Sequence, residues 1–209
     1  VLYVASDPIF AQKAYESVKT LSGRKCTLLP AKDEVILYKD ALSKDALFKR
    51  ISAIYELTHG TDIIITDIEA VMQLFPERVE VITFKKNCEL DYASIPEKLV
   101  KMGYTREYSV DTRGCFAVRG DILDIFPVNS ENPVRIDFFG DTVERIRPYD
   151  EISGDRLQEA DEICVCAATD VICTPTDAAS IVKVLSSEIK KFNTAQSYER
   201  AKTIADDIT

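Results

Sequence analysis

The first third of the chain alternates short apolar runs with amphipathic segments. Runs of strand length lie at residues 2–6, 25–30 and 62–66. Between them, apolar positions recur at helical spacing. Asp7 and Ser43 precede the two predicted helices as N-caps, and Gly23 and Gly60 end them. Because strands without polar interruption are covered on both faces, the pattern predicts a parallel βαβ domain over residues 1–79, with a short helix at 68–75 and a strand at 79–84 as its last pieces.

The pattern changes over residues 80–167. A helix over residues 94–103, capped by Ser94 and ended by Gly103, is followed by three successive strand-like segments at residues 106–110, 115–127 and 133–149. Gly140 and Asp141 interrupt the last of these as a two-residue hairpin turn. The region is therefore predicted to be an α+β domain built on an antiparallel sheet.

The segment from residue 134 to residue 139 shows which side of that sheet is buried. Alternate residues of a strand share a face, so Val134, Ile136 and Phe138 are predicted to point into the core. The opposite face carries Arg135, Asp137 and Phe139. An aromatic side chain between charges is typical of a protein-binding surface, although an ordinary solvated sheet face is also compatible with this pattern.

Residues 168–209 read as a partial helical domain. An amphipathic helix is predicted at residues 176–192, and a second begins near residue 195. We expect this segment to complete the first domain or to continue into sequence beyond the chain. The predicted fold class is thus α/β, a parallel-sheet domain followed by an α+β domain built on an antiparallel sheet.

Composition narrows the classes of function. With 209 residues, 46% of them hydrophobic, the chain can bury a sizeable core. It has no run of about 18 apolar residues that would span a membrane. Its six cysteines are scattered through apolar segments, which favours a reducing, cytoplasmic setting. The net charge of −9 argues against general binding of nucleic acid.

Arginine is concentrated in one region. Six of the eleven arginines lie between residues 101 and 150, where Lys101 is the one lysine. Arginine is enriched in protein interfaces and lysine is depleted there, so the bias indicates recognition of a partner.

Catalytic motifs are missing from the sequence. The glycines form neither a phosphate-binding G-x-x-x-x-G-K-[ST] loop nor G-x-G-x-x-G, so no nucleotide cofactor is predicted. His59, the single histidine, is placed at a helix end. Cys164 and Cys166 read as core positions of a strand and not as metal ligands. An Arg-Gly-Asp tripeptide begins at Arg119, but its apolar flanks disfavour an exposed adhesion loop. The run that ends at Asp67 resembles the phospho-acceptor strand of receiver domains, but the acidic pair that those domains carry after their first strand is reduced here to Asp7 alone.

A longer resemblance begins at Gly103. The run GYTREYSVDTRGCFAVRGDILDIFPVNSENPVRIDFFGDTVERIRPYD resembles the second domain shared by the bacterial excision-repair protein UvrB and the transcription-repair coupling factors. Segments on both sides of it also resemble that family, which implies its split first domain, 1a and 1b, around the second domain. UvrB-type relatives carry a tyrosine-rich DNA-probing hairpin where this chain has residues 28–45, with Tyr38 as the single aromatic. This departure favours the N-terminal module of a coupling factor over a fragment of a UvrB-type helicase.

The resemblance implies a non-catalytic docking function. In that family the second domain binds UvrA and so brings repair proteins to a stalled RNA polymerase. The polymerase, the DNA and the ATP-dependent translocase activity belong to regions of the full-length protein outside this chain. Arg119, Arg135 and Phe139 stand at the motif positions that carry the UvrA contact. The secondary candidates are Asp137, Asp121 and Arg145.

Overall fold

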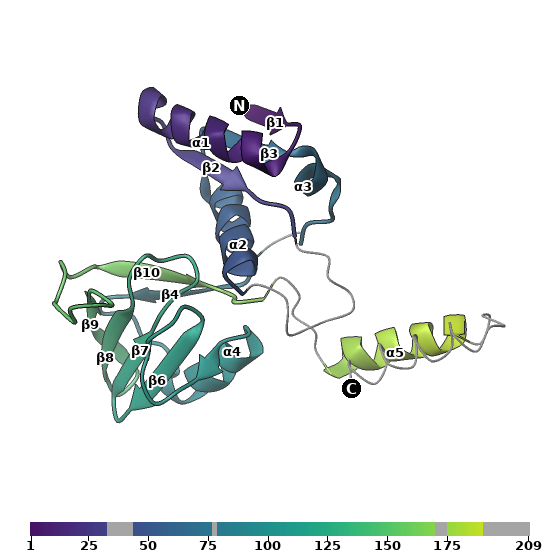
Figure 1. Cartoon of the computed structure of the whole chain (residues 1–209). Coiled ribbons are helices and arrows are strands. Elements are labelled where there is room, and N and C mark those ends of the chain that lie inside the picture. The colour runs from purple at the N-terminus through teal and green to yellow at the C-terminus, as the bar shows by residue number, and fades with distance from the viewer. Residues whose placement is uncertain (33–43, 77–78, 170–174, 190–209) are drawn as a thin grey trace. The chain divides into compact units, whose positions relative to one another are not determined.

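The computed structural model describes residues 1–32, 44–76, 79–169 and 175–189 (Figure 1). The predicted cap Ser43 and the second C-terminal helix lie outside these residues. The chain forms two compact units, residues 1–170 and 171–209. It has a mixed α/β architecture with several sheets, one of them largely antiparallel.

A three-stranded parallel sheet opens the first unit, with strand order β1-β3-β2. Its strands are β1 (Leu2–Ala5), β2 (Cys26–Leu29) and β3 (Ile63–Asp67), and its helices are α1 (Pro8–Ser22), α2 (Lys44–His59) and α3 (Ile68–Met72). Leu28 packs in the cluster on the α1 side, whereas Leu29 packs with Ala53 and Ile54 of α2. Because successive strand residues face opposite ways, α1 and α2 cover opposite faces of this sheet.

Local signals fix the first helix as the sequence predicts. The Asp7 Oδ1 accepts hydrogen bonds from the backbone N–H groups of Ile9 and Phe10, both at 3.0 Å. Gly23 ends the helix with φ 60°, a left-handed conformation that glycine adopts without steric cost. At the end of α2, the His59 ring stacks on Tyr55, which agrees with its assignment as a helix-terminal residue.

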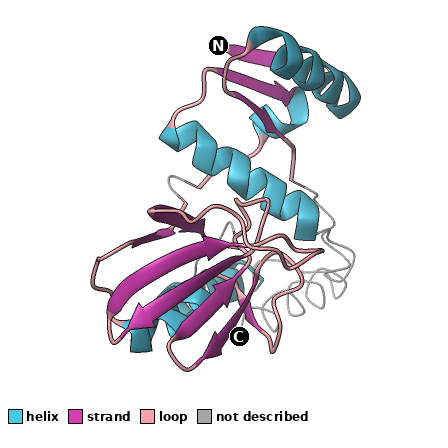
Figure 2. Ribbon diagram, turned by 90° about the vertical axis from the view of Figure 1, so that its left-hand side faces the viewer, coloured by secondary structure: helices cyan, strands magenta, loops and turns pink. Residues whose placement is uncertain are grey.

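A five-stranded sheet dominates the remainder of the first unit (Figure 2). Its strands, in spatial order, are β5 (Thr105–Arg106), β6 (Cys115–Arg119), β7 (Ile122–Ile125), β8 (Val134–Phe139) and β9 (Thr142–Pro148). All neighbours pair antiparallel except β5 and β6. Of the strand predicted at residues 106–110, only Arg106 lies in a strand, β5, which pairs parallel with β6.

The strand predicted at residues 79–84 also has a different place. It is β4 (Val81–Lys85), which pairs antiparallel with β10 (Glu162–Cys166) in a separate two-stranded sheet. Cys164 and Cys166 lie on β10, as predicted, and Cys166 is fully buried. Between β4 and β5 lie a 3₁₀ turn (Tyr92–Ser94) and α4 (Ile95–Lys101). Ser94 precedes α4, but its side chain makes no capping hydrogen bond and donates instead to the Asp91 carbonyl.

One large core joins these elements. The inward residues of the five-stranded sheet pack against Ile95 and Leu99 of α4, against Val165 of β10, and against Phe48 and Ile51 of α2. A hydrogen bond from the Ser52 hydroxyl to the Val128 carbonyl, 2.9 Å, adds a polar link between α2 and the sheet region.

The second unit contributes α5 (Pro175–Ile189), which lies within the helix predicted at residues 176–192 apart from its first residue. Within the residues the structure describes, no helix is long and apolar enough to cross a membrane.

Candidate partner-binding face

Two Gly-Asp turns shape the candidate site. Gly120-Asp121 joins β6 to β7 and Gly140-Asp141 joins β8 to β9, with φ 58° and 59° at the two glycines. Tyr92 ties both turns together: its hydroxyl donates to the Gly120 carbonyl at 2.7 Å, and its N–H donates to Asp141 Oδ1 at 3.0 Å. The Arg-Gly-Asp tripeptide is therefore a hairpin turn held by the body of the domain.

Strand register brings the predicted residues onto one outward face. One row across the sheet pairs Arg119 with Ile122, Ile122 with Asp137, and Asp137 with Arg145. The neighbouring row runs from Ala117 through Asp124 and Arg135 to Arg147. Phe139 ends β8 and is 76% exposed, whereas Val134, Ile136 and Phe138 are buried on the other side. The alternation predicted for residues 134–139 is confirmed.

A β-bulge preserves this division between the two faces. The register shifts between Asp137 and Phe138, so that Asp137 pairs with Arg145 while Phe138 pairs with Val143. Glu144 is thereby left as the extra residue of β9. The bulge lets both Phe138 and Val143 remain in the core.

Asp124 is the anchor of the face. Its carboxylate is buried, with 3% of the residue exposed, and it accepts two hydrogen bonds from Arg135: 2.6 Å from Nε and 2.9 Å from Nη2. The hydrogen bonding to Asp124 raises the pKa of Arg135 above its ordinary value. The Nη1 of Arg119 approaches the same carboxylate at 3.8 Å. The fork of Arg135 is thus fixed by its own chain, a feature that the sequence pattern did not reveal.

Tyr108 and Tyr149 add aromatic surface that the sequence reasoning missed. Arg119 donates from Nη2 to the Tyr108 carbonyl at 2.7 Å and lies over the Tyr108 ring at 5.5 Å. Tyr108 is 91% exposed. Arg135 lies 5.9 Å from the centre of the Tyr149 ring, and burial raises the pKa of that phenol. The visible signal was that both tyrosines lie within the arginine-rich region, residues 101–150.

The secondary candidates have different environments. Asp137 forms an ion pair with Arg147, and both side chains are mostly buried. Arg145 is exposed in the row beside Asp137. The Asp121 side chain is exposed, and its carbonyl accepts from the Phe138 N–H at 2.9 Å. Asp137 therefore holds Arg147 within the domain, while Arg145 and Asp121 are exposed and can contact a partner.

Two further kinds of site that the sequence raised are a metal site and a phospho-acceptor aspartate. Within the described residues, no group of three or more His, Cys, Asp or Glu side chains could hold a metal ion. Asp67, the acceptor in the receiver-like interpretation, is buried and caps α3 through a 2.9 Å hydrogen bond from the Ala70 N–H. Its carboxylate is part of the local fold.

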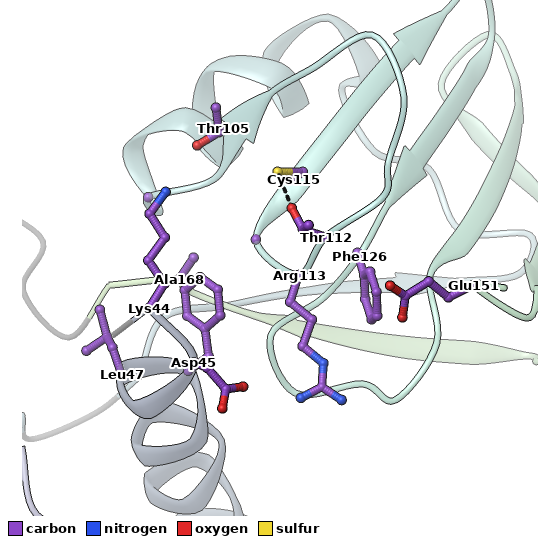
Figure 3. A pocket seen from close by; sticks show the side chains of 13 residues that line it. Lys44, Asp45, Leu47, Thr105, Thr112, Arg113, Cys115, Phe126, Glu151 and Ala168 are labelled. Atoms are coloured by element: carbon purple, nitrogen blue, oxygen red, sulfur yellow. Dashed lines mark hydrogen bonds between the residues drawn. The ribbon is translucent and has the colours of Figure 1, made fainter. Parts of the chain in front are cut away.

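A cavity of about 680 Å³ lies between the start of α2 and the strands β5 and β6 (Figure 3). Thr112 and Cys115 line it, with 3.3 Å between Oγ1 and Sγ. The charged groups of Lys44, Arg113 and Glu151 spread around the cavity and do not converge on one point. This arrangement does not assemble a nucleophile with a base.

Comparison with known proteins places part of this chain beside a family of interaction domains. Residues 82–170 match the model of the UvrB interaction domain. The chain is 35% identical over 159 residues to the transcription-repair-coupling factor of Myxococcus xanthus, a match that covers 70% of the chain and 13% of that protein.

Two further relatives are a second coupling factor and a UvrABC system protein B. Identity is 28% over 184 residues to the transcription-repair-coupling factor of Bacillus subtilis, covering 85% of the chain and 16% of that protein. It is 31% over 164 residues to the UvrABC system protein B of the same organism, covering 76% of the chain and 25% of that protein. The chain thus spans between 13% and 25% of the length of these relatives.

Proposed function

We propose that this chain is the UvrA-docking module of a transcription-repair coupling factor and that it recruits UvrA to stalled RNA polymerase. The observation that carries the proposal is the outward face of the region that matches the UvrB interaction domain, on which Arg119, Arg135 and an exposed Phe139 lie together. In this account the polymerase and DNA are partners of the full-length protein through regions outside this chain. The module itself binds no ATP and catalyses no reaction.

The chemistry of the face fits a partner with both apolar and acidic groups. Phe139 supplies an apolar anchor, since a large exposed aromatic at the end of a rigid strand loses little freedom on binding. Arg119 is half exposed and supplies charge-assisted hydrogen bonds to carboxylates of UvrA. Arg135, held by Asp124, supplies positive charge in a fixed position. Arg145 and Asp121 lie at the rim.

The domain organisation belongs to the same proposal. Residues 1–79 form domain 1a, residues 80–167 form the UvrA-binding domain 2, and residues 168–209 begin domain 1b. Docking would then be a property of the middle part of the chain.

A second candidate is a fragment of a UvrB-type damage-recognition helicase, because UvrB relatives match with similar identity. The single aromatic, Tyr38, in residues 28–45 favours the coupling factor. The genomic sequence on either side of this chain separates the two. A phosphate-binding loop directly upstream in a chain of UvrB length supports the helicase, whereas a much longer chain with a distant translocase supports the coupling factor.

Gel filtration of the chain mixed with purified UvrA tests the docking function. We expect a complex for the wild type and a much weaker one for Arg119→Ala. Arg24→Ala is the matched control, because Arg24 is exposed and lies in the loop between α1 and β2. Separate elution of wild-type chain and UvrA at micromolar concentrations contradicts the proposal.

A further inference from the structure

A small hollow lies beside the proposed docking face, where β9 ends. Its volume is about 240 Å³. It is lined by Arg135, Arg147, Pro148, Tyr149, Gly154 and Arg156. Three of the six lining residues are arginines, in a chain whose net charge is −9. The hollow has room for several groups of the size of a water molecule, at roughly 30 Å³ each, and therefore for a carboxylate and its methylene groups.

The loop that carries Arg156 is held in place by hydrogen bonds to Asp150. The Asp150 Oδ1 accepts from the N–H groups of Ile152 at 3.0 Å and Ser153 at 2.7 Å. The Asp150 carbonyl accepts from the Gly154 N–H at 2.9 Å, and Arg156 returns to form a β-bridge with Tyr149. The backbone of Arg156 is therefore anchored next to the end of β9.

The three arginines differ in how their charge is balanced. Arg135 is paired with Asp124, and Arg147 is paired with Asp137. Among the described residues, Arg156 has no ion pair, and the buried Nε of Arg147 has no hydrogen-bond acceptor. Arg156 is thus left without a carboxylate partner in this part of the chain, and Arg147 Nε is a further donor without an acceptor.

We infer that this hollow accepts one carboxylate side chain of the docked partner, an Asp or Glu of UvrA, with Arg156 as its principal donor. The inference rests on the proposed docking function and extends the site beyond the face of Arg119, Arg135 and Phe139. A carboxylate fits better than a backbone phosphate of DNA, because the net charge of −9 repels a polyanion over its whole length. Guanidinium–carboxylate pairing is also the chemistry that this face already uses with Asp124 and Asp137.

Calorimetric titration of UvrA with the wild-type chain, Arg156→Ala and Arg156→Glu tests the inference. Loss of a charge-assisted pair predicts about tenfold weaker binding for Arg156→Ala, and charge reversal predicts about hundredfold for Arg156→Glu. Thermal unfolding should be unchanged, because Arg156 has no side-chain partner among the described residues to lose. Arg24→Glu, the same charge change at an exposed position of the other region, should bind as the wild type does.

The outcomes separate this inference from the docking function. If Phe139→Ala loses UvrA while Arg156→Glu binds within twofold of the wild type, the acidic subsite is wrong and the docking function stands. If the wild type binds no UvrA, both are wrong. A parallel anisotropy titration uses a 30-base-pair duplex as probe. Salt-sensitive DNA binding that Arg156→Glu abolishes, with UvrA binding unchanged, would assign the hollow to a phosphate and overturn the inference.

Discussion

Arg135→Ala should destabilise the domain, although Arg135 lies on the outward face. The guanidinium supplies both hydrogen bonds to the carboxylate of Asp124, which is 3% exposed. When Arg135 is removed, the nearest remaining cation is Arg119, with its Nη1 at 3.8 Å. The variant therefore leaves a buried and largely uncompensated negative charge.

The magnitude follows from the exposure of the two partners. Breaking a fully buried ion pair by removing one partner costs about 3–5 kcal/mol. The Arg135 side chain is 39% exposed, so in the variant water can enter the vacated space and solvate the Asp124 carboxylate. We therefore expect the free energy of unfolding to fall by about 1–3 kcal/mol. For a chain of this size each kcal/mol lowers the midpoint of thermal unfolding by about 2–4 °C, so the expected shift is roughly 2–12 °C.

A double-mutant cycle measures this coupling. Urea unfolding of the wild type, Arg135→Ala, Asp124→Asn and the double variant gives the four free energies of unfolding. The double variant should be less destabilised than the sum of the single variants, because the amide that replaces the Asp124 carboxylate has no charge to leave uncompensated. Additive effects, or an Arg135→Ala variant as stable as the wild type, would show that Asp124 does not depend on Arg135. Phe139→Ala is the comparison that should leave stability unchanged.

Three further changes test the fold that supports the face. Gly114→Ala should lower stability by about 1–3 kcal/mol, since its Cβ would lie 2.7 Å from Phe48 Cζ at φ +80°, and an unchanged urea midpoint contradicts this. Ile136→Ala, on the fully buried face of β8, should cost about 2–5 kcal/mol, and a loss below 1 kcal/mol would place Ile136 outside the core. Burial raises the pKa of Tyr104 above its ordinary value of 10.0. Below pH 10 the phenol is neutral in both states and the free energy of unfolding does not depend on it. At higher pH the unfolded chain ionises first, so the free energy of unfolding falls as the pH rises. Urea midpoints between pH 8 and 11 should fall less steeply for Tyr104→Phe, and identical slopes would refute this.

The sequence predicted the elements whose signals are local. The Asp7 cap, the Gly23 stop and the Gly140 turn each act through neighbouring backbone, and the alternation along β8 reports burial directly. Strand pairing was harder to predict from the sequence. β4 was predicted in the parallel sheet but pairs with β10, which lies about 80 residues later in the chain, and no local pattern encodes such a contact.

The sequence predicted which residues of the candidate face point outward, but not the hydrogen bonds and ion pairs between them. Parity placed Arg135 and Phe139 outward together, and the register confirms that direction. The pairing of Arg135 with Asp124 depends on the register between β7 and β8, which the sequence did not specify. The sequence did not predict that Arg156 lines the hollow, because its position depends on the conformation of the loop that carries it.

The affinity of UvrA for Phe139→Ala tests the central claim most directly. Phe139 is 76% exposed and makes no contribution to the core, so a change in binding reports the interface alone. Truncating an aromatic anchor at the centre of an interface costs about 2 kcal/mol or more, which is about thirtyfold in Kd. The matched control is Leu74→Ala, since Leu74 is 97% exposed and lies just after α3. The account predicts that calorimetric titration finds binding weakened at least thirtyfold for Phe139→Ala and unchanged for Leu74→Ala. Equal affinity of Phe139→Ala and the wild type would contradict it and place the docking site on another surface.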